Sequence, residues 1–548
     1  MADLSYLSFP NPDQFRYLSI IDVFKDKTNE APENEICVER SVGGGRRSLT
    51  NADLLNRSTD IAKYLIAKGI RPGDSVAITG PNSIEWIIGE FAILMAGAVS
   101  VQIHKTSELF SETLKLLKST KCNAVLIDPE SDEDYVSDME AHFGTEGSIK
   151  DIMVALLLRK SLPSSLLSLD DIVLNDAEKE VYLPRIQPES IALIFTTSGS
   201  TGFPKMVEYT HFAITNASYL SFFATAGNPP YGKCYNDRPF SWFAGSPLFS
   251  ILNGNTRVFM NTAIGMKTGN ILKIWDIIMA EQCTSAMLLP YAIFDILANL
   301  DTITKTGYKL YTIATGGQRI GSHVTEVCGK CTEKLIMGYG TTETAVVSYI
   351  EMAPEIEEGH VGSLLPGYEV KVIGDKKQIL NRGLLGEILV RSAFTLKSYR
   401  NARDLNIASF TDHDWFRSGD IGIITTEGKL FLKGKSNDVI KRGGLKVLAS
   451  IVEAAMSTFP EIREVVVIPV PDARLFEEVC ACYVLKDYLN TTEVDLDKKC
   501  RVILGDNVLG NTPSYFLRFD SFPSLSNGKT DKVLLRKQAM KRLNLAGW

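Results

Sequence analysis

Glycine and hydroxyl residues gather in one short segment whose residue types suit phosphate binding. Residues 196–205 read TTSGSTGFPK. Gly199 and Gly202 permit positive φ angles and close backbone approach, so successive N–H groups can point at phosphate oxygens. The spacing differs from the P-loop pattern GxxxxGK[ST], which disfavours a P-loop NTPase. The candidate phosphate ligands are Thr197, Ser198, Gly199, Ser200, Thr201, Gly202 and Lys205.

A surface turn is the alternative interpretation of this segment, because Ser, Thr, Gly and Pro are the usual turn residues. The residues before it, 191–196, read IALIFT and predict a buried strand that runs directly into the segment. The composition of residues 196–205 is therefore compatible both with a surface turn and with a phosphate-binding loop.

Five further segments carry polar residues in a fixed order along the chain. Each is also compatible with an ordinary loop or turn when it is considered alone. The segments are ATGGQRI at 314–320, YGTTET at 339–344, WFRSGD at 415–420, GKSNDVIKRGGLKV at 434–447 and SNGKTDK at 526–532.

Taken together with residues 196–205, these segments resemble the adenylate-forming (AMP-binding) enzyme superfamily, which includes acyl-CoA synthetases and luciferases. The resemblance covers most of the chain. It implies activation of a carboxylic acid by ATP to an acyl-adenylate, with release of pyrophosphate, and then transfer of the acyl group to CoA. ATP, Mg²⁺ and CoA would therefore be the cofactor and co-substrates, and the acid a small molecule.

The resemblance implies catalytic roles for four residues. Lys529 would reach the substrate carboxylate and phosphate, and Thr342 would contact the α-phosphate. Glu343 would bind Mg²⁺, a hard cation suited to carboxylate oxygens, with Thr201 as a weaker metal ligand. Lys441 would lie in the segment that meets the thiol-bearing acceptor.

A second set of residues is implied in nucleotide binding. Tyr339 would lie against the adenine, and Asp420 would accept hydrogen bonds from the ribose hydroxyls. The remaining members of this set are Gly316, Gly317 and Gln318 in the adenine-side turn, Gly340 and Thr341 in the YGTTET segment, and Lys435 on the ribose side.

Two departures from the family pattern keep other functions open. Lys435 stands where arginine is usual, which removes a bidentate fork but retains one charge. Ser250 stands where many relatives have a histidine near the acyl pocket. A luciferase-like enzyme, a carrier-protein-dependent enzyme and a nucleotide-binding protein without turnover are the alternatives.

The acid itself is not identified by the sequence. An apolar acyl or aryl group would suit the aromatic residues expected in the pocket wall, although the same residues could belong to an ordinary core. They are Phe240, Trp242, Phe243, Phe249, Tyr291 and Phe294.

The sequence patterns of the helices and strands that must position these residues predict an α/β fold combined with α+β parts. Apolar β-branched runs alternate with helical patterns and predict largely parallel sheets in the first two thirds. These runs are 75–79, 124–127, 191–196, 310–314 and 335–338. Short strands between 369 and 424 predict a small antiparallel subdomain. We expect an N-terminal adenylation domain at 1–434, a hinge near 435–437 and a small mobile C-terminal α+β domain at 438–548.

The composition sets the broad class. The chain has 548 residues, 45% of them hydrophobic, and a formal net charge of -7, which offers no general attraction to nucleic acid.

The apolar stretch 86–103 contains Glu90 and is too short to span a bilayer, so a buried helix followed by a strand is expected. Nine scattered cysteines make a poor disulfide framework. A cytoplasmic protein is predicted, and the oligomeric state stays open.

Overall fold

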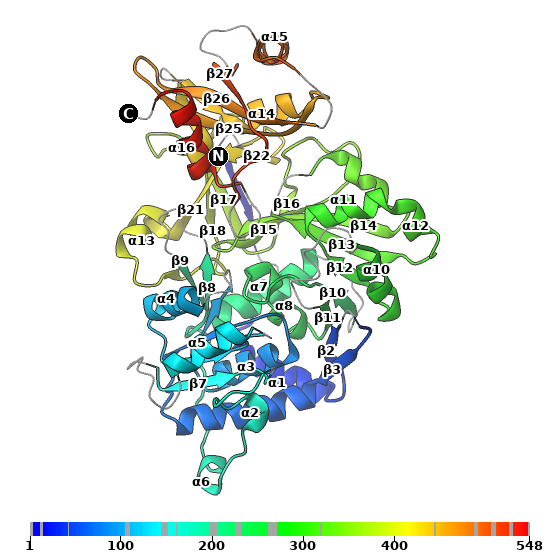
Figure 1. Ribbon diagram of the computed structural model, residues 1–548, viewed down its shortest axis with the longest axis vertical. Coiled ribbons are helices and arrows are strands. Elements are labelled where there is room, and N and C mark those ends of the chain that lie inside the picture. Colours follow the sequence, from blue (N-terminus) through cyan, green and yellow to red (C-terminus); the bar gives the residue numbers. More distant parts are fainter. Residues whose placement is uncertain are drawn as a thin grey trace. The chain divides into compact units, whose positions relative to one another are not determined.

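The structure is a computed structural model of the chain. It describes residues 4–10, 15–41, 43–104, 110–130, 132–143, 152–160, 162–197, 205–224, 232–260, 271–317, 320–442, 445–486, 491–505, 511–524 and 530–545. Over these ranges the strands form four sheets, of nine, seven, six and five strands. The helices and strands are labelled in Figure 1.

The chain forms two compact units. One comprises Leu7–Val370 and Val390–Phe416, and it contains the nine-stranded and seven-stranded sheets. The other comprises Met1–Tyr6, Lys371–Leu389 and Arg417–Trp548, and it contains the five-stranded sheet. The hinge predicted near 435–437 is not tested by this division and stays a prediction.

The seven-stranded sheet carries both ends of the predicted phosphate segment. Its order is β19-β9-β8-β5-β4-β6-β7. Strands β4 to β8 pair in parallel, and β9 is antiparallel to β8 and to β19. The bounds are β4 (Ser75–Thr79), β5 (Val99–Ile103), β6 (Ala124–Ile127), β7 (Val154–Leu157), β8 (Ile191–Thr197), β9 (Lys205–Thr210) and β19 (Ser398–Tyr399).

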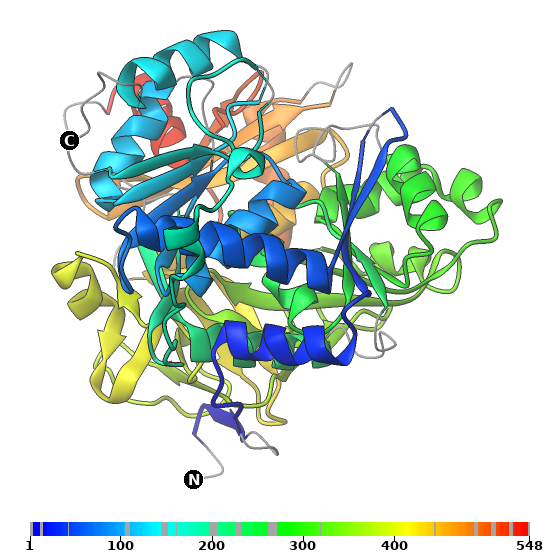
Figure 2. The same ribbon diagram turned by 90° about the horizontal axis from the view of Figure 1, so that it is seen from below.

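Several helices around this sheet begin at clear capping residues. Helix α3 (Ile84–Met95) begins after Ser83, whose hydroxyl accepts a hydrogen bond from the Trp86 N–H at 3.1 Å. It lies side by side with α1 (Ile20–Glu30) and α2 (Asn51–Ala67), as Figure 1 and Figure 2 show. The other helices of this part are α4 (Phe110–Thr120), α5 (Glu133–Phe143) and α6 (Asp176–Lys179).

The nine-stranded sheet has the order β16-β15-β14-β13-β12-β10-β11-β2-β3. Its central strands β10 to β14 pair in parallel, and apolar side chains of α10 and α11 form a buried core with them. The strand bounds are β2 (Glu35–Arg40), β3 (Arg46–Thr50), β10 (Lys233–Tyr235), β11 (Thr256–Met260), β12 (Ser285–Met287), β13 (Leu310–Gly316), β14 (Thr332–Thr341), β15 (Ala345–Glu351) and β16 (Ser363–Leu364). The helix bounds are α7 (His211–Ala224), α8 (Leu248–Ile251), α10 (Ile271–Ala280), α11 (Pro290–Ala298) and α12 (Leu300–Thr304).

Two smaller sheets complete the fold. The six-stranded sheet has the order β1-β17-β18-β21-β20, with β22 on β21, and the five-stranded sheet has the order β24-β23-β26-β25, with β27 on β26. The first contains β1 (Tyr6–Phe9), β17 (Tyr368–Ile373), β18 (Gly386–Arg391), β20 (Phe410–Thr411), β21 (Trp415–Ile424) and β22 (Leu430–Lys435), with α13 (Arg403–Ser409) nearby in sequence. The second contains β23 (Val439–Arg442), β24 (Leu445–Leu448), β25 (Ile462–Asp472), β26 (Phe476–Leu485) and β27 (Tyr515–Arg518), with α14 (Ala449–Ser457), α15 (Glu493–Leu504) and α16 (Lys532–Arg542).

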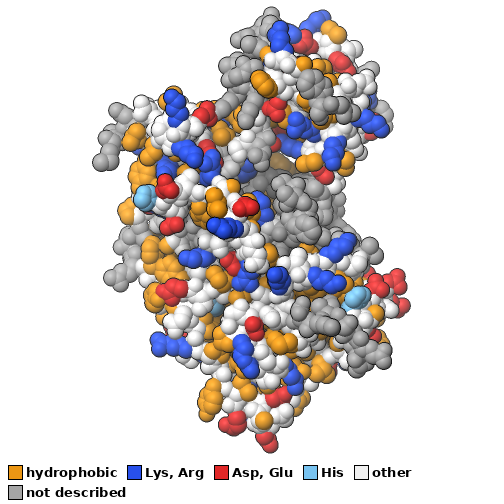
Figure 3. Space-filling view, turned by 90° about the vertical axis from the view of Figure 1, so that its left-hand side faces the viewer, with side chains coloured by type: hydrophobic (Ala, Val, Ile, Leu, Met, Phe, Trp, Pro, Cys, Tyr) orange, Lys and Arg blue, Asp and Glu red, His pale blue; other side chains and the backbone are white. Residues whose placement is uncertain are grey.

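These elements confirm the predicted fold class. Each predicted strand of the first two thirds is present, and the stretch around Glu90 is a buried helix followed by the strand β5. All nine cysteines are free thiols in the structure. On the face seen in Figure 3, the described basic and acidic side chains are interspersed, as the balanced composition leads one to expect.

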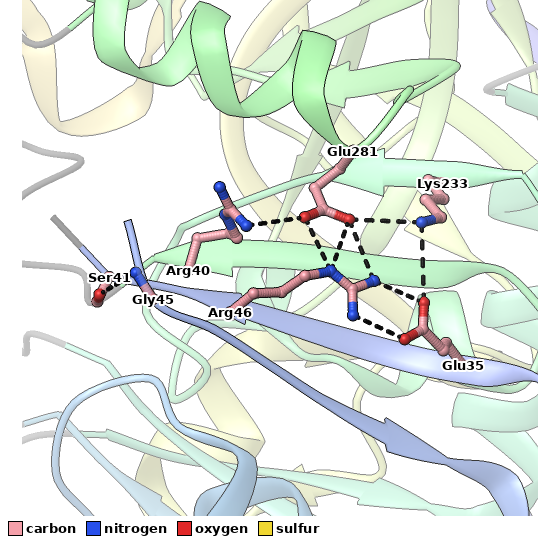
Figure 4. A network of polar contacts seen from close by, with 7 residues as sticks. All are labelled: Glu35, Arg40, Ser41, Gly45, Arg46, Lys233 and Glu281. Atoms are coloured by element: carbon pink, nitrogen blue, oxygen red, sulfur yellow. Dashed lines mark hydrogen bonds and ion pairs between the residues drawn. The ribbon is translucent and has the colours of Figure 1, made fainter. Parts of the chain in front are cut away.

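A network of charged side chains lies near the β2–β3 edge of the nine-stranded sheet (Figure 4). The Glu281 carboxylate is only 5% exposed, and it accepts from the Arg46 Nε at 3.1 Å. The Nη1 of Arg40 and the Nζ of Lys233 lie 3.3 and 3.4 Å from its oxygens. Arg46 also donates to Glu35 and lowers the pKa of that carboxyl to about 2. The network therefore links β2, β3, β10 and the end of α10 through one buried carboxylate.

Glu90 is a buried acid in α3 beneath strand β5. It is 1% exposed, and its Oε1 accepts a hydrogen bond from Gln102 Nε2 at 2.8 Å. Burial raises the pKa of Glu90 to about 8, against an ordinary value of 4.5. The folded state therefore binds this proton more tightly than the unfolded chain does.

This pKa predicts that the free energy of unfolding falls as the pH rises from about 4.5 through 8, because only the unfolded chain releases the proton there. One pKa unit corresponds to about 1.4 kcal/mol, so the full penalty above pH 8 is on the order of 5 kcal/mol. Glu90→Gln should remove it and raise the thermal midpoint at pH 9 but not at pH 4.5. Parallel curves of thermal midpoint against pH for the two proteins would contradict the prediction.

Candidate active site

The predicted phosphate segment is bracketed by two paired strand ends. Thr197 is the last residue of β8 and lies opposite Lys205, the first residue of β9. The strand β8 is held in place partly by Thr196, whose hydroxyl donates to the Gln102 carbonyl oxygen at 2.8 Å. The predicted ligands Ser198, Gly199, Ser200, Thr201 and Gly202 lie outside the described residues.

Tyr399 connects the two charged residues that the sequence placed in this site. Its hydroxyl donates to Glu343 Oε1 at 3.0 Å, and the Lys205 Nζ lies 5.5 Å from the centre of its ring. Burial and the neighbouring Glu343 carboxylate raise the pKa of Tyr399, so it stays a hydrogen-bond donor at neutral pH. We name Lys205, Tyr399 and Glu343 the Lys–Tyr–Glu cluster.

The sequence did not indicate Tyr399. It lies in none of the segments with a recognisable pattern, and it reaches the cluster because β19 pairs with β9, with Tyr399 opposite Val207. A tyrosine between Ser398 and Arg400 carries no local sign of such a pairing.

Glu343 belongs to a tight turn between β14 and β15. The turn is closed by hydroxyls, since the N–H groups of Glu343 and Thr344 donate to Thr341 Oγ1 at 3.2 and 3.3 Å. Its backbone is also held from outside by the buried hydroxyl of Tyr209, which donates to the Thr342 carbonyl oxygen at 2.7 Å. The Leu396 N–H donates to the Glu343 carbonyl oxygen at 2.7 Å. These contacts fix the turn that presents the predicted catalytic pair Thr342 and Glu343.

Glycines allow the strands to approach closely next to this turn. Gly316 pairs with Gly338 across β13 and β14, and a Cβ atom on Gly316 would lie 2.8 Å from the Gly338 carbonyl oxygen. Gly317 follows with φ +84°. The register thus brings the predicted adenine-side turn beside Tyr339, which is half-buried. The third residue of that turn, Gln318, lies outside the described residues.

A largely apolar cavity of about 160 Å³ adjoins the same strand ends. Gly338, Ala345 and Val346 line it, and they flank the turn that carries Thr342 and Glu343. Of the aromatic residues predicted for the acid pocket, Phe243 and Phe249 line the cavity, together with Ser250.

The other predicted aromatic residues do not line the cavity. Phe240 is a core residue, 1% exposed, against Trp86 and Phe259. Phe294 is 42% exposed and stacks on His323 with their ring centres 5.7 Å apart. Trp242 contacts His104 by an edge, and Tyr291 packs against the core under the sheet.

Asp420 and Lys435 form a pair within the second compact unit. They face each other across β21 and β22, and the Lys435 Nζ lies 2.6 Å from Asp420 Oδ1. Asp420 is buried, whereas Lys435 is 53% exposed. The lysine that replaces arginine therefore neutralises the carboxylate predicted to receive the ribose hydroxyls.

The remaining predicted residues can be placed only in part. Lys441 lies in β23 opposite Lys446. Lys529 lies outside the described residues. In the part of the chain that the structure describes, no group of three or more His, Cys, Asp or Glu side chains is arranged to hold a metal ion.

Two protein-family models match the chain. The model of the AMP-binding enzymes matches residues 24–400, and that of their C-terminal domain matches residues 451–529. The chain belongs to the AMP-binding enzyme family.

Known relatives of this AMP-binding enzyme are distant. It is 26% identical to the medium-chain acyl-CoA ligase ACSF2, mitochondrial, of Danio rerio, over 88% of this chain and 82% of the relative. It is 27% identical to the putative acyl-CoA synthetase YngI of Bacillus subtilis, over 91% and 93% of the two chains.

Solved structures share the fold of this AMP-binding enzyme. The ATP-bound MatB of Rhodopseudomonas palustris superposes with a TM-score of 0.77 at 22% identity, over 96% of this chain and all of the other. The amide bond synthetase McbA of Marinactinospora thermotolerans gives the same TM-score at 23% identity, over 95% and 99%. The fold is thus shared with an ATP-bound protein and with an amide bond synthetase.

The compartment of this AMP-binding enzyme stays a prediction. Over the described ranges, no helix has both the length and the apolar character needed to cross a membrane. The relative ACSF2 is named as mitochondrial, whereas the sequence led us to expect the cytoplasm.

Proposed function

We propose that this enzyme activates a carboxylic acid with ATP and transfers the acyl group to CoA. In the first half-reaction an oxygen of the acid attacks the α-phosphorus, the bond to the bridging oxygen breaks, and pyrophosphate leaves. In the second, the thiol sulfur of CoA attacks the acyl carbonyl carbon, the thiol proton is lost, and AMP leaves.

The observation that carries the first half-reaction is the Lys–Tyr–Glu cluster beside the apolar cavity. Two anions must meet for the acid to attack the phosphate, so a cation and oriented donors are needed where charge develops on the leaving oxygens. Lys205 supplies a cation beside Tyr399, and the cavity offers an acid body a place next to the Thr342–Glu343 turn. Family membership and the named activities of ACSF2 and YngI support the same reaction.

Glu343 fits the Mg²⁺ ion that the family implies. Mg²⁺ is commonly held by one or two carboxylates together with substrate phosphates and water. Glu343 is a half-buried carboxylate whose position is fixed by the Tyr399 hydroxyl at 3.0 Å. When bound, the ion would supply positive charge to the phosphate oxygens during the displacement.

Isotope exchange between pyrophosphate and ATP, with a panel of carboxylic acids, tests the first half-reaction. We expect acid-dependent exchange that Lys529→Ala abolishes, because this lysine is proposed to reach the reacting carboxylate. Lys441→Ala is the matched control, since it should retain exchange and lose most thioester formation with CoA.

Other outcomes separate the alternatives. Exchange without any thioester product would favour a different acceptor, and light emission with added luciferin or acylation of a carrier protein would identify it. A folded protein that binds ATP but supports no exchange with any acid would contradict the proposal. That result would favour nucleotide binding without turnover.

A further inference from the structure

Four polar side chains form a row across the floor of the cavity. Arg257 lies opposite Cys234, Cys234 opposite Ser285, and Ser285 opposite Thr312, on the neighbouring parallel strands β11, β10, β12 and β13. All four line the cavity. Because paired residues of parallel strands stand side by side on one face of a sheet, the register alone creates this polar row. We name these four residues the polar row.

The polar row lies at the end of the cavity away from the Thr342–Glu343 turn. Thr312 precedes Gly316 by four residues on β13, and Gly316 is paired with Gly338 at the turn end of β14. At about 3.3 Å per strand residue, the polar row is about 13 Å along the strands from that level. An acid whose carboxyl group reacts near the turn would therefore direct its other end toward the polar row.

Arg257 brings a buried cation to the polar row. It is 1% exposed, and its Nε and Nη2 donate to the carbonyl oxygens of Asn236 and Gly245 at 2.6 and 2.8 Å. Both acceptors are uncharged, and among the described residues Arg257 makes no ion pair. Arg238 adds a second buried guanidinium, which donates to the Met287 carbonyl oxygen at 2.8 Å.

Among the described residues, the buried cations of this region outnumber its buried carboxylates. Asp237 is the buried carboxylate beside these arginines, and it accepts a hydrogen bond from the Tyr235 hydroxyl at 3.0 Å. Burial lowers the pKa of Arg238 and of Arg257 to about 10, which still leaves both charged at neutral pH. Two cations therefore face one carboxylate, and a buried charge without a partner is costly.

Within the described part of the chain, several polar atoms in the cavity wall have no hydrogen-bond partner. The hydroxyls of Ser246, Thr312 and Thr315 and the Oδ1 of Asn255 are buried without a hydrogen bond among the described residues, and all four residues line the cavity. Buried polar atoms are nearly always hydrogen-bonded in folded proteins. A purely apolar acyl chain would leave these atoms without a hydrogen bond and the Arg257 guanidinium without a counter-ion.

Resting on the function proposed above, we propose that the acid activated here is a dicarboxylic acid whose second carboxylate binds Arg257. This carboxylate would supply the missing negative charge, and its lone pairs would accept from the guanidinium. The cavity of about 160 Å³ is close to the roughly 150 Å³ that accommodates a benzene molecule. The body between the two carboxyl groups is therefore short or compact.

Matched pairs of acids test the proposal directly. Exchange between pyrophosphate and ATP is measured with hexanoate against adipate and with octanoate against suberate. We expect kcat/KM to be at least tenfold higher for the better diacid than for the monoacid of the same length. The thermal midpoint with ATP present should also rise more with the diacid, because a ligand that binds only the folded state stabilises it.

Two variants identify Arg257 as the cause of the preference. Arg257→Met should remove the preference for the diacid, whereas Arg257→Lys should retain part of it. Arg257 also donates to two backbone carbonyl groups, so substituting it removes structural hydrogen bonds as well. Asn255→Asp leaves Arg257 in place and is therefore the second variant. It introduces a carboxylate in the cavity wall two residues before Arg257, at an atom without a partner among the described residues, and should lower the ratio of exchange with the diacid to exchange with the monoacid at least tenfold.

The outcomes distinguish this inference from the proposed function. If monoacids support exchange as well as their diacids, the enzyme is an adenylating enzyme but the dicarboxylic substrate is wrong. If no acid of either kind supports exchange or shifts the thermal midpoint, the proposed function itself fails. An Asn255→Asp variant with unchanged selectivity would overturn the role of Arg257.

Discussion

Glu343→Gln should lower kcat/KM for exchange between pyrophosphate and ATP about 10²–10³-fold, the usual effect of removing one group that stabilises the transition state. The substitution keeps the size of the side chain and removes the negative charge proposed to hold Mg²⁺. The Tyr399 hydroxyl can still donate to the amide oxygen, so the turn should keep its position. The Mg²⁺ concentration for half-maximal exchange should rise together with the loss of rate.

Tyr399→Phe is the control for this result. It removes the hydrogen bond of 3.0 Å to Glu343 Oε1 but keeps the carboxylate and the ring beside Lys205. We expect a loss of about tenfold, well below that of Glu343→Gln, since a hydrogen bond to a charged group contributes about 1.5 kcal/mol or somewhat more while the carboxylate itself remains. Equal losses in the two variants, or an unchanged Mg²⁺ dependence in Glu343→Gln, would argue against Glu343 as the metal ligand.

Gly340→Ala should destabilise the β14–β15 hairpin and distort the site at the same time. A Cβ atom at this position would lie 1.9 Å from the Ala345 carbonyl oxygen, which is far inside van der Waals contact. The register of the two strands already shifts between Tyr339 and Gly340, so the backbone has no simple way to yield. We expect a loss of about 3 kcal/mol in the free energy of unfolding, as for a strongly overpacked core. A displacement of the turn by about 1 Å would lower kcat about 10²-fold.

Gly338→Ala is the matched control in the same strand. Its Cβ would meet Val346 Cγ1 at 3.5 Å, an ordinary contact. The thermal midpoint of this variant should stay close to that of the unchanged protein, whereas that of Gly340→Ala should fall clearly. Because Gly338 lines the cavity, the comparison uses stability and not activity. Equal thermal midpoints for the two variants would contradict the steric argument.

The strands could be predicted because their signals are local. The runs 75–79 and 124–127 coincide with β4 and β6, since apolar β-branched residues bounded by polar ones mark a buried strand. The ends of strands were less predictable. Tyr339 to Thr341 continue β14, and the RSGD residues lie inside β21, although both segments were also compatible with turns. Glycine and polar residues at these places belong to strands because a partner strand accepts their backbone hydrogen bonds.

The order of the polar segments along the chain was enough to indicate the family. The same segments predicted roles for Glu343, Asp420 and Lys205, because chemistry with phosphates restricts which residue types can serve. The partners of these residues depend on strand register, which the sequence does not reveal since it arises from pairing between distant segments. Register places Tyr399 between Lys205 and Glu343, and Lys435 against Asp420. Register also aligns Arg257 with Cys234, Ser285 and Thr312. The adenylate-forming class could therefore be inferred from residue types in order, whereas the charged floor of the cavity emerges only when separate strands are brought side by side.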